Sequence, residues 1–80
     1  MLTLQRLEEV ATGVIGAPVR LAADQSAADV PGWDSLNSTL IALDLSETLG
    51  VELNGWDLAQ CETFGALIEV VNRKCRPDPI

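Results

Sequence analysis

Apolar residues recur at the spacing of one helix face in three stretches of this 80-residue chain, and this pattern limits the possible fold more than any other feature. The stretches cover about residues 2–15, 35–49 and 64–75. Glycine and proline separate them, because proline cannot continue a helix and glycine favours turns. Residues 56–60 allow only a turn or two of helix. We therefore expect an all-α bundle of three longer helices and one short helix, with a long first loop over about residues 19–33.

A chain of 80 residues has room for one hydrophobic core, so we expect residues 1–80 to form a single domain. Thr63 can cap the last helix, and Pro77 and Pro79 predict a non-helical tail. The apolar face of the first helix is formed by Leu4, Leu7, Ala11, Val14 and Ile15. That of the last helix is formed by Phe64, Leu67, Ile68 and Val71. The residues expected to hold the long loop to the core are Val19, Leu21 and Val30.

The stretch 35–49 differs from the others because its apolar residues fall on two separate faces of the helix. One face carries Ile41, Ala42, Leu45 and Leu49. The second, called here the leucine face, carries Leu36, Leu40 and Leu43 and ends at Glu47. A small bundle can easily bury only one such face, so we expect the leucine face to be partly exposed, as a protein docking surface would be. The alternative is that both faces are buried between neighbouring helices and the loop.

The residues Pro31-Gly32-Trp33-Asp34-Ser35-Leu36 connect the long loop to this helix. Pro31-Gly32 predicts a turn, and the Asp34 carboxylate can accept hydrogen bonds from the free N–H groups of the first helical turn. Ser35 would then occupy the first helical position, exposed to solvent and close to the positive end of the helix dipole, which favours an attached phosphate. Asp-Ser pairs also begin many ordinary helices, so these residues alone indicate no more than a cap.

The net charge of −7 at pH 7 limits the partners of the chain. An acidic chain without a basic stretch repels polyphosphate, so we expect no nucleic-acid binding. Basic protein partners would be attracted, although solubility alone also explains an acidic balance. No signal peptide and no membrane-spanning run is visible after Met1, so we expect no membrane association and a cytoplasmic location.

The sequence offers no catalytic arrangement. It contains no histidine, so a Ser-His-Asp triad cannot form, and neither Cys61 nor Cys75 has an imidazole to activate its thiol. The two cysteines lack the spacing of a metal site, so none is expected. We expect Cys61 to be a small core residue and Cys75 a free thiol, with a disulfide between them as the weaker alternative. The carboxylates do not cluster as acid–base catalysis requires. We therefore expect that the protein is not an enzyme.

The order of these elements resembles the acyl carrier protein family, whose four-helix domains carry acyl chains on a phosphopantetheine arm. The resemblance runs from about residue 4 to residue 74. An isolated Asp-Ser-Leu is a weak signal, but here it occurs together with further matching stretches. The stretches that carry the resemblance are Gly32-Trp33-Asp34-Ser35-Leu36, Glu47-Thr48-Leu49-Gly50-Val51-Glu52-Leu53 and Glu62-Thr63-Phe64-Gly65-Ala66-Leu67-Ile68.

This resemblance implies that Ser35 is the attachment site of 4′-phosphopantetheine, which a separate magnesium-dependent phosphopantetheinyl transferase would transfer from coenzyme A. Asp34 and Leu36 would complete the attachment motif. The thiol of the arm would then carry acyl intermediates as thioesters between the acyl-loading and acyl-processing enzymes of a biosynthetic pathway, with the chain acting as a monomer. The implied partner-recognition residues are Leu36, Leu40, Leu43 and Glu47. The implied core residues are Ile41, Leu45, Leu49, Leu53, Cys61, Phe64, Leu67 and Ile68.

Two departures from fatty-acid carriers indicate a specialised pathway. Leu40 stands where many of those carriers have glutamate, and Ser46 and Thr48 interrupt the acidic run usual on this helix. Docking would therefore depend more on apolar contact, and the Gly-Trp-Asp-Ser-Leu form looks more like carriers of polyketide-type pathways than of primary fatty-acid synthesis. A peptidyl (aminoacyl) carrier is an alternative, although its residues before the serine typically differ.

A hypothesis from another class is an unmodified helical interaction module. In that case Ser35 only begins a helix, and the leucine face binds a partner protein. A third hypothesis keeps the carrier fold as an unmodified scaffold or regulatory subunit, against which the intact serine argues.

Overall fold

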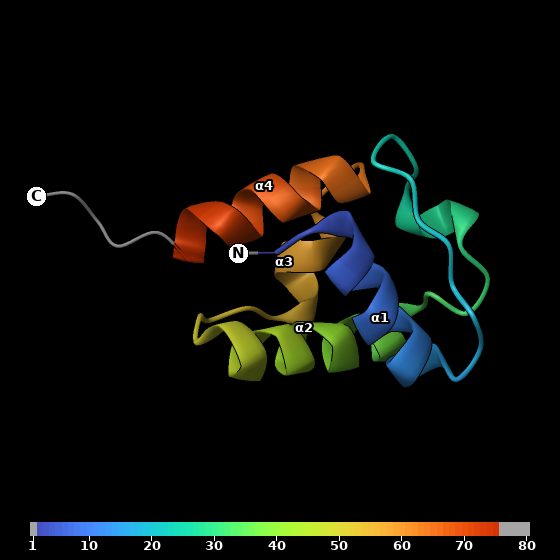
Figure 1. Ribbon diagram of the computed structural model, residues 1–80, viewed down its shortest axis with the longest axis horizontal. Coiled ribbons are helices and arrows are strands. Elements are labelled where there is room, and N and C mark those ends of the chain that lie inside the picture. The colour runs from blue at the N-terminus through green and yellow to red at the C-terminus, as the bar shows by residue number, and fades with distance from the viewer. Residues whose placement is uncertain (1, 76–80) are drawn as a thin grey trace, which may run out of the picture.

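The computed structural model describes residues 2–75, and within this range the fold is all-α, as expected (Figure 1). The tail expected at Pro77 and Pro79 lies outside the described residues. The elements in chain order are α1 (Leu4–Ile15), the short 3-10 helix η1 (Ala27–Asp29), α2 (Ser35–Leu49), α3 (Gly55–Ala59) and α4 (Phe64–Cys75). In Figure 1, α2 and α4 lie on opposite sides of the molecule, and α1 and α3 lie between them.

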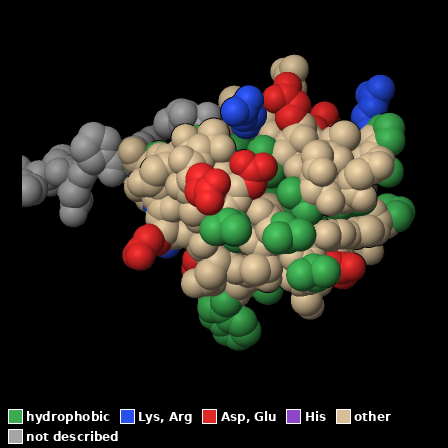
Figure 2. All heavy atoms as spheres, turned by 90° about the horizontal axis from the view of Figure 1, so that it is seen from below, with side chains coloured by type: hydrophobic (Ala, Val, Ile, Leu, Met, Phe, Trp, Pro, Cys, Tyr) green, Lys and Arg blue, Asp and Glu red, His purple; other side chains and the backbone are tan. Residues whose placement is uncertain are grey.

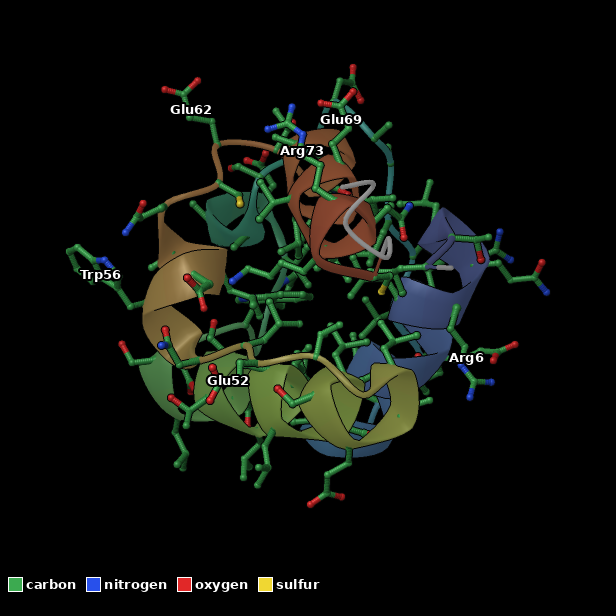
Figure 3. All side chains as sticks on the ribbon, turned by 90° about the vertical axis from the view of Figure 1, so that its left-hand side faces the viewer. Arg6, Glu52, Trp56, Glu62, Glu69 and Arg73 are labelled. Atoms are coloured by element: carbon green, nitrogen blue, oxygen red, sulfur yellow. The ribbon has the colours of Figure 1, made fainter. Side chains whose placement is uncertain are left out.

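The core lies where the inner faces of these helices meet (Figure 3). Leu7 of α1, Ile41 and Leu45 of α2, and Val71 of α4 are at most 1% exposed. The implied core is confirmed at Ile41, Leu45, Phe64 and Leu67, which are all buried. The other members of the implied core pack against these buried residues and are themselves partly buried. Those members are Leu49, Leu53, Cys61 and Ile68.

The predicted limits are confirmed for α2 and α4, whereas α1 begins two residues later than predicted. Thr3 caps α1, and its hydroxyl accepts a hydrogen bond from the Arg6 N–H at 3.2 Å. Leu2 is buried in front of the helix. Its backbone N–H donates to Asn72 Oδ1 at 2.7 Å, and its carbonyl accepts from Asn72 Nδ2 at 3.0 Å. The start of the chain is therefore joined to α4 rather than added to α1.

The short helix α3 both begins and ends one residue earlier than predicted, since Gln60 is its C-cap. It begins at Gly55 because Asn54 and Asp57 form a capping box. The Asn54 side chain accepts from the Asp57 N–H, and the Asp57 carboxylate accepts from the Asn54 N–H, both at 3.0 Å. The next residue, Gly55, lies directly against α2, since a Cβ at this position would be only 2.7 Å from Thr39 Oγ1. This cap and this close contact fix the first turn of α3 beside the first half of α2.

The long loop is held to the helices on both sides, as its apolar residues predicted. Leu21 and Val30 are buried, and Val19 packs against the core. The Leu21 N–H donates to Glu8 Oε2 of α1 at 2.8 Å. At the other side, the Phe64 and Gly65 N–H groups of α4 donate to loop carbonyl groups at 3.0 and 2.9 Å. The loop is therefore a packed part of the structure.

The short helix η1 was not predicted. It is closed by a capping box in which the Ser26 N–H donates to Asp29 Oδ2 at 3.1 Å. The pattern Ser-x-x-Asp was a sequence signal for this turn.

Candidate functional site

Ser35 is the first residue of α2, and its side chain is exposed. Asp34 caps the helix as predicted, because its Oδ1 atom accepts a hydrogen bond from the Asn37 N–H at 2.8 Å. The Asn37 side chain in turn donates to the Gly32 carbonyl at 2.6 Å, and the Thr39 hydroxyl donates to the Ser35 carbonyl at 3.0 Å. These bonds fix the backbone on both sides of Ser35. The hydroxyl therefore stands at a rigid helix start, at the positive end of the α2 dipole.

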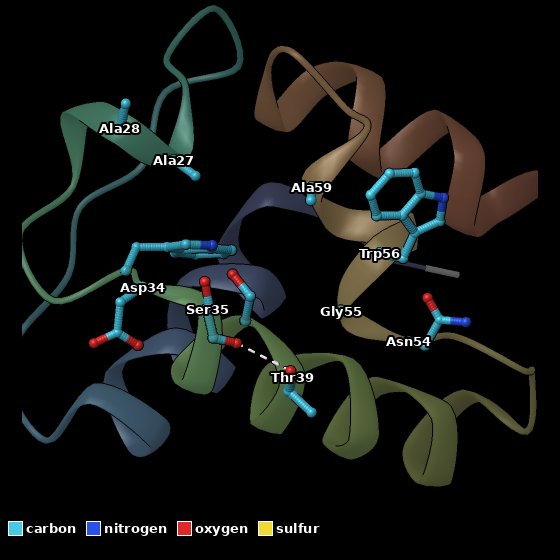
Figure 4. A pocket seen from close by; sticks show the side chains of 11 residues that line it. Ala27, Ala28, Asp34, Ser35, Thr39, Asn54, Gly55, Trp56 and Ala59 are labelled. Atoms are coloured by element: carbon cyan, nitrogen blue, oxygen red, sulfur yellow. Dashed lines mark hydrogen bonds between the residues drawn. The ribbon is translucent and has the colours of Figure 1, made fainter.

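A groove of about 680 Å³ opens beside Ser35 (Figure 4). Its floor is the start of α2, including Ser38 and Thr39. One wall comes from η1 and the other from α3, where Trp56 stands 71% exposed and points away from the bundle (Figure 3). The residues lining the groove are Ala27, Ala28, Trp33, Asp34, Ser35, Ser38, Thr39, Asn54, Gly55, Trp56 and Ala59.

The leucine face of α2 is exposed, so the expectation of a free second face is confirmed. Leu36, Leu40 and Leu43 are 68%, 42% and 55% exposed, whereas Ile41 on the other face is fully buried. The alternative that both faces are buried is wrong. Figure 2, which views the molecule from the α2 side, shows separate apolar side chains with acidic side chains among them. Glu47 is also exposed, at the far end of this face.

Sequence reasoning singled out Ser35 and the leucine face but not the groove. The groove depends on how η1, α2 and α3 are placed in space, and its small residues carry no pattern of their own. Trp56 was assigned to the short helix without a role, because an exposed tryptophan cannot be told from a buried one by residue type.

The described residues hold no group of three or more metal-ligating side chains, and none of their helices has the length and apolar character needed to cross a bilayer. Cys61 and Cys75 are free thiols, each half-buried. Partial burial raises the pKa of the Cys61 thiol, and the Asp57 carboxylate raises it further. The Cys61 thiol also donates to the Asp57 carbonyl at 3.4 Å, which favours the protonated form. The surroundings of Cys61 therefore disfavour the thiolate, which is the form that a nucleophilic cysteine needs.

We predict that Cys61 is alkylated slowly in the native protein. Since its pKa is raised, less thiolate is present at any pH near neutrality, and the rate should reach half its maximum at a higher pH than in an unfolded chain. The measurement is the pH profile of iodoacetamide labelling at the Cys61 peptide, in buffer and in urea. Asp57→Asn should move the native profile to lower pH. If the native protein reached half its maximal labelling rate at the same pH as the unfolded chain or at a lower one, the raised pKa of Cys61 would be contradicted.

The family model of the phosphopantetheine attachment site matches residues 5–71. The chain belongs to this family. Proteins of the phosphopantetheine attachment family carry covalently bound 4′-phosphopantetheine and act as carriers rather than as enzymes. The matched range contains the capped start of α2 and most residues of the bundle. No curated protein and no solved structure matches the chain.

Proposed function

We propose that Ser35 is the residue that carries the phosphopantetheine arm, with Asp34 and Leu36 completing the attachment motif. The observation that carries this proposal is the position of its hydroxyl: exposed, first in a capped helix and beside an open groove. These residues fit the group. A phosphodiester on Ser35 lies at the positive end of the α2 dipole, and the groove gives the arm space along the surface.

The attachment is a substitution at phosphorus. The Ser35 hydroxyl oxygen forms a bond to the phosphate that bears pantetheine in coenzyme A, and the bond from that phosphate to the adenosine bisphosphate half breaks. The serine proton passes to a base of the magnesium-dependent transferase. Asp34 keeps the α2 start in place through its bond to the Asn37 N–H while the hydroxyl reacts. Once attached, the group supplies a thiol that holds acyl groups as thioesters.

We further propose that the leucine face is where acyl-loading and acyl-processing enzymes dock. Its three leucines are between 42% and 68% exposed, and burying apolar area of this kind supports association. Glu47 ends this face with a negative charge that a basic residue of a partner can meet. The small acidic content of this face favours a specialised, polyketide-type pathway over primary fatty-acid synthesis. The residues before Ser35, Gly32-Trp33-Asp34, favour an acyl cargo over an aminoacyl one.

The attachment proposal is tested with two matched variants, Ser35→Ala and Ser38→Ala. Both remove one hydroxyl from the first turns of α2 beside the same groove. After incubation with coenzyme A, magnesium and a broad-specificity phosphopantetheinyl transferase, Ser38→Ala should gain one arm by intact mass and Ser35→Ala none. Alanine is a good helix former, so the unfolding free energy of Ser35→Ala should stay within roughly 0.5 kcal/mol of the wild type. An arm on Ser35→Ala would refute the assignment.

The unmodified interaction module predicts a different set of results. No variant would gain an arm, and a partner protein would bind Ser35→Ala as well as the wild type but would fail to bind Leu40→Asp.

A further inference from the structure

We infer that the Trp33 side chain blocks the entry of the acyl group into the helical core. The acyl group would then stay outside, in the groove beside Ser35. This inference rests on the proposed attachment at Ser35. It adds a cargo class: short or oxygen-bearing acyl groups rather than long saturated chains.

The first observation is the contrast between the spaces on the two sides of Trp33. The outer groove measures about 680 Å³, whereas the space directly behind Trp33 measures about 10 Å³. Among residues 2–75, Trp33 and Ala27 are the two that line both of these spaces. The inner space is lined further by buried residues of α3 and α4, among them Leu58, Phe64 and Leu67. Trp33 is therefore the large side chain that separates the groove from the core.

The inner space is too small for an acyl chain. A volume of about 10 Å³ holds at most one water molecule, and a cavity that takes up benzene measures roughly 150 Å³. An alkyl chain could enter only if the surrounding side chains moved apart, and close-packed interiors resist such movement.

Trp33 is also fixed in its position. Its ring centroid lies 4.9 Å from that of Phe64 at an interplanar angle of 55°, a favourable tilted arrangement of two aromatic rings. Phe64 is 2% exposed, and its N–H donates to the Gln25 carbonyl at 3.0 Å. The backbone N–H of Trp33 donates to the Val30 carbonyl at 3.2 Å, which fixes the backbone from which the indole projects. Moving the indole would therefore break the ring contact between the loop and α4 as well as open the core.

The groove itself suits polar groups on a carbon skeleton. The hydroxyl groups of Ser38 and Thr39 and the amide of Asn54 line it together with two indoles and three alanines. The Thr39 hydroxyl already donates to the Ser35 carbonyl, and the Asn54 Oδ1 atom already accepts from the Asp57 N–H. The Ser38 hydroxyl, the Thr39 oxygen as an acceptor and the Asn54 Nδ2 amide can still exchange hydrogen bonds with oxygen-bearing groups on a carried acyl group, whereas a saturated chain offers them no partner. The groove therefore suits short or oxygen-bearing acyl groups better than long saturated chains.

The experiment compares wild-type protein loaded from acetyl-coenzyme A with protein loaded from octanoyl-coenzyme A, after intact mass has shown one acylated arm on each. We expect equal melting temperatures, and we expect hydroxylamine to cleave each thioester as fast as the matching free acyl-pantetheine. A chain held inside the folded protein would raise Tm by roughly 4 °C or more and would slow the cleavage. A raised Tm or a slowed cleavage for octanoyl would overturn the inference.

Two further variants test the role of Trp33 itself. Trp33→Ala should open the groove to the core, so octanoyl loading should now raise Tm relative to acetyl loading of the same variant. Trp56→Ala removes the indole from the opposite wall, where it covers no core space, and should behave as the wild type. Trp33→Leu replaces Trp33→Ala if the latter does not fold. If a folded Trp33 variant showed the same Tm with octanoyl as with acetyl, Trp33 would not be the residue that blocks the core.

The two proposals fail in different ways. If no arm is added at Ser35, the mass measurement already shows it before any melting curve is recorded. If the arm and the acyl group are present but octanoyl is protected in the wild type, the carrier function stands and the closure by Trp33 is wrong.

Discussion

Replacing Leu45 with alanine is expected to lower the free energy of unfolding by about 2–5 kcal/mol. Leu45 is 1% exposed and lies in the middle of the inner face of α2, next to the fully buried Ile41 and Ala42. Removing its outer carbons loses apolar burial and leaves a cavity that the neighbouring helices cannot fully close. Because a small domain is stable by only about 5–15 kcal/mol, this loss should be evident in urea unfolding.

The matched control is Leu40→Glu on the leucine face of the same helix. Leu40 is 42% exposed, and glutamate is a good helix former, so the change should cost roughly 0.5 kcal/mol or less. The same variant should weaken binding to partner enzymes if the leucine face is the docking surface. Similar losses for Leu45→Ala and Leu40→Glu would mean that both faces contribute to the core, and the docking proposal would fail.

The second large effect is expected for Gly32→Ala, which should destabilise the protein by about 1–3 kcal/mol. Gly32 has a φ angle of 86°, a region that residues with a Cβ rarely adopt. A Cβ at this position would also lie 2.8 Å from Ile15 Cγ2. The Gly32 carbonyl accepts the bond from the Asn37 side chain, so a shift of this turn would also disturb the backbone next to Ser35.

Two glycine controls separate the causes. Gly13→Ala, in α1 with nothing within 4 Å of the added carbon, should stabilise by roughly 0.5–1 kcal/mol because alanine favours the helix. Gly16→Ala also places a Cβ at a positive φ angle, 83°, but the added carbon meets no atom within 4 Å, so only the backbone strain remains. Urea midpoints should therefore rank Gly13→Ala above Gly16→Ala and Gly16→Ala above Gly32→Ala. A Gly32→Ala protein as stable as Gly16→Ala would show that Ile15 moves aside freely.

The parts of the fold that could be predicted depend on local chemistry. The start and end of α2 follow from the Asp34 cap and from Gly50, whose φ of 68° ends the helix. The two faces of α2 follow from the spacing of its apolar residues, and the exposed position of Ser35 follows from its place directly after the Asp34 cap. These features are set by residues within one or two turns of each other.

The parts that could not be predicted depend on contacts between distant segments. Leu2 fits the apolar face of α1, but its backbone is paired with Asn72 of α4, so the helix begins after Thr3. The sequence shows Ser46 only as an interruption of an acidic run. Its oxygen accepts from the Leu53 N–H at 3.0 Å and so holds the connection between α2 and α3, while its single hydrogen faces the Ala42 carbonyl at 2.7 Å and the Leu53 carbonyl at 3.0 Å.

The groove and the position of Trp33 beside it also depend on contacts between distant segments. They arise only when the long loop meets α4, where the rings of Trp33 and Phe64 come together. The sequence marks Trp33 as part of a motif but contains no signal that it lies between the groove and the core.

The most direct test of the central claim is to locate the modification on the wild-type protein. After incubation with coenzyme A, magnesium and a phosphopantetheinyl transferase, the protein is digested, and the peptide that contains the start of α2 is fragmented in a mass spectrometer. We predict one phosphopantetheine per chain, on Ser35. An arm on another hydroxyl, such as Ser26 or Ser38, or no arm at all, would contradict the account.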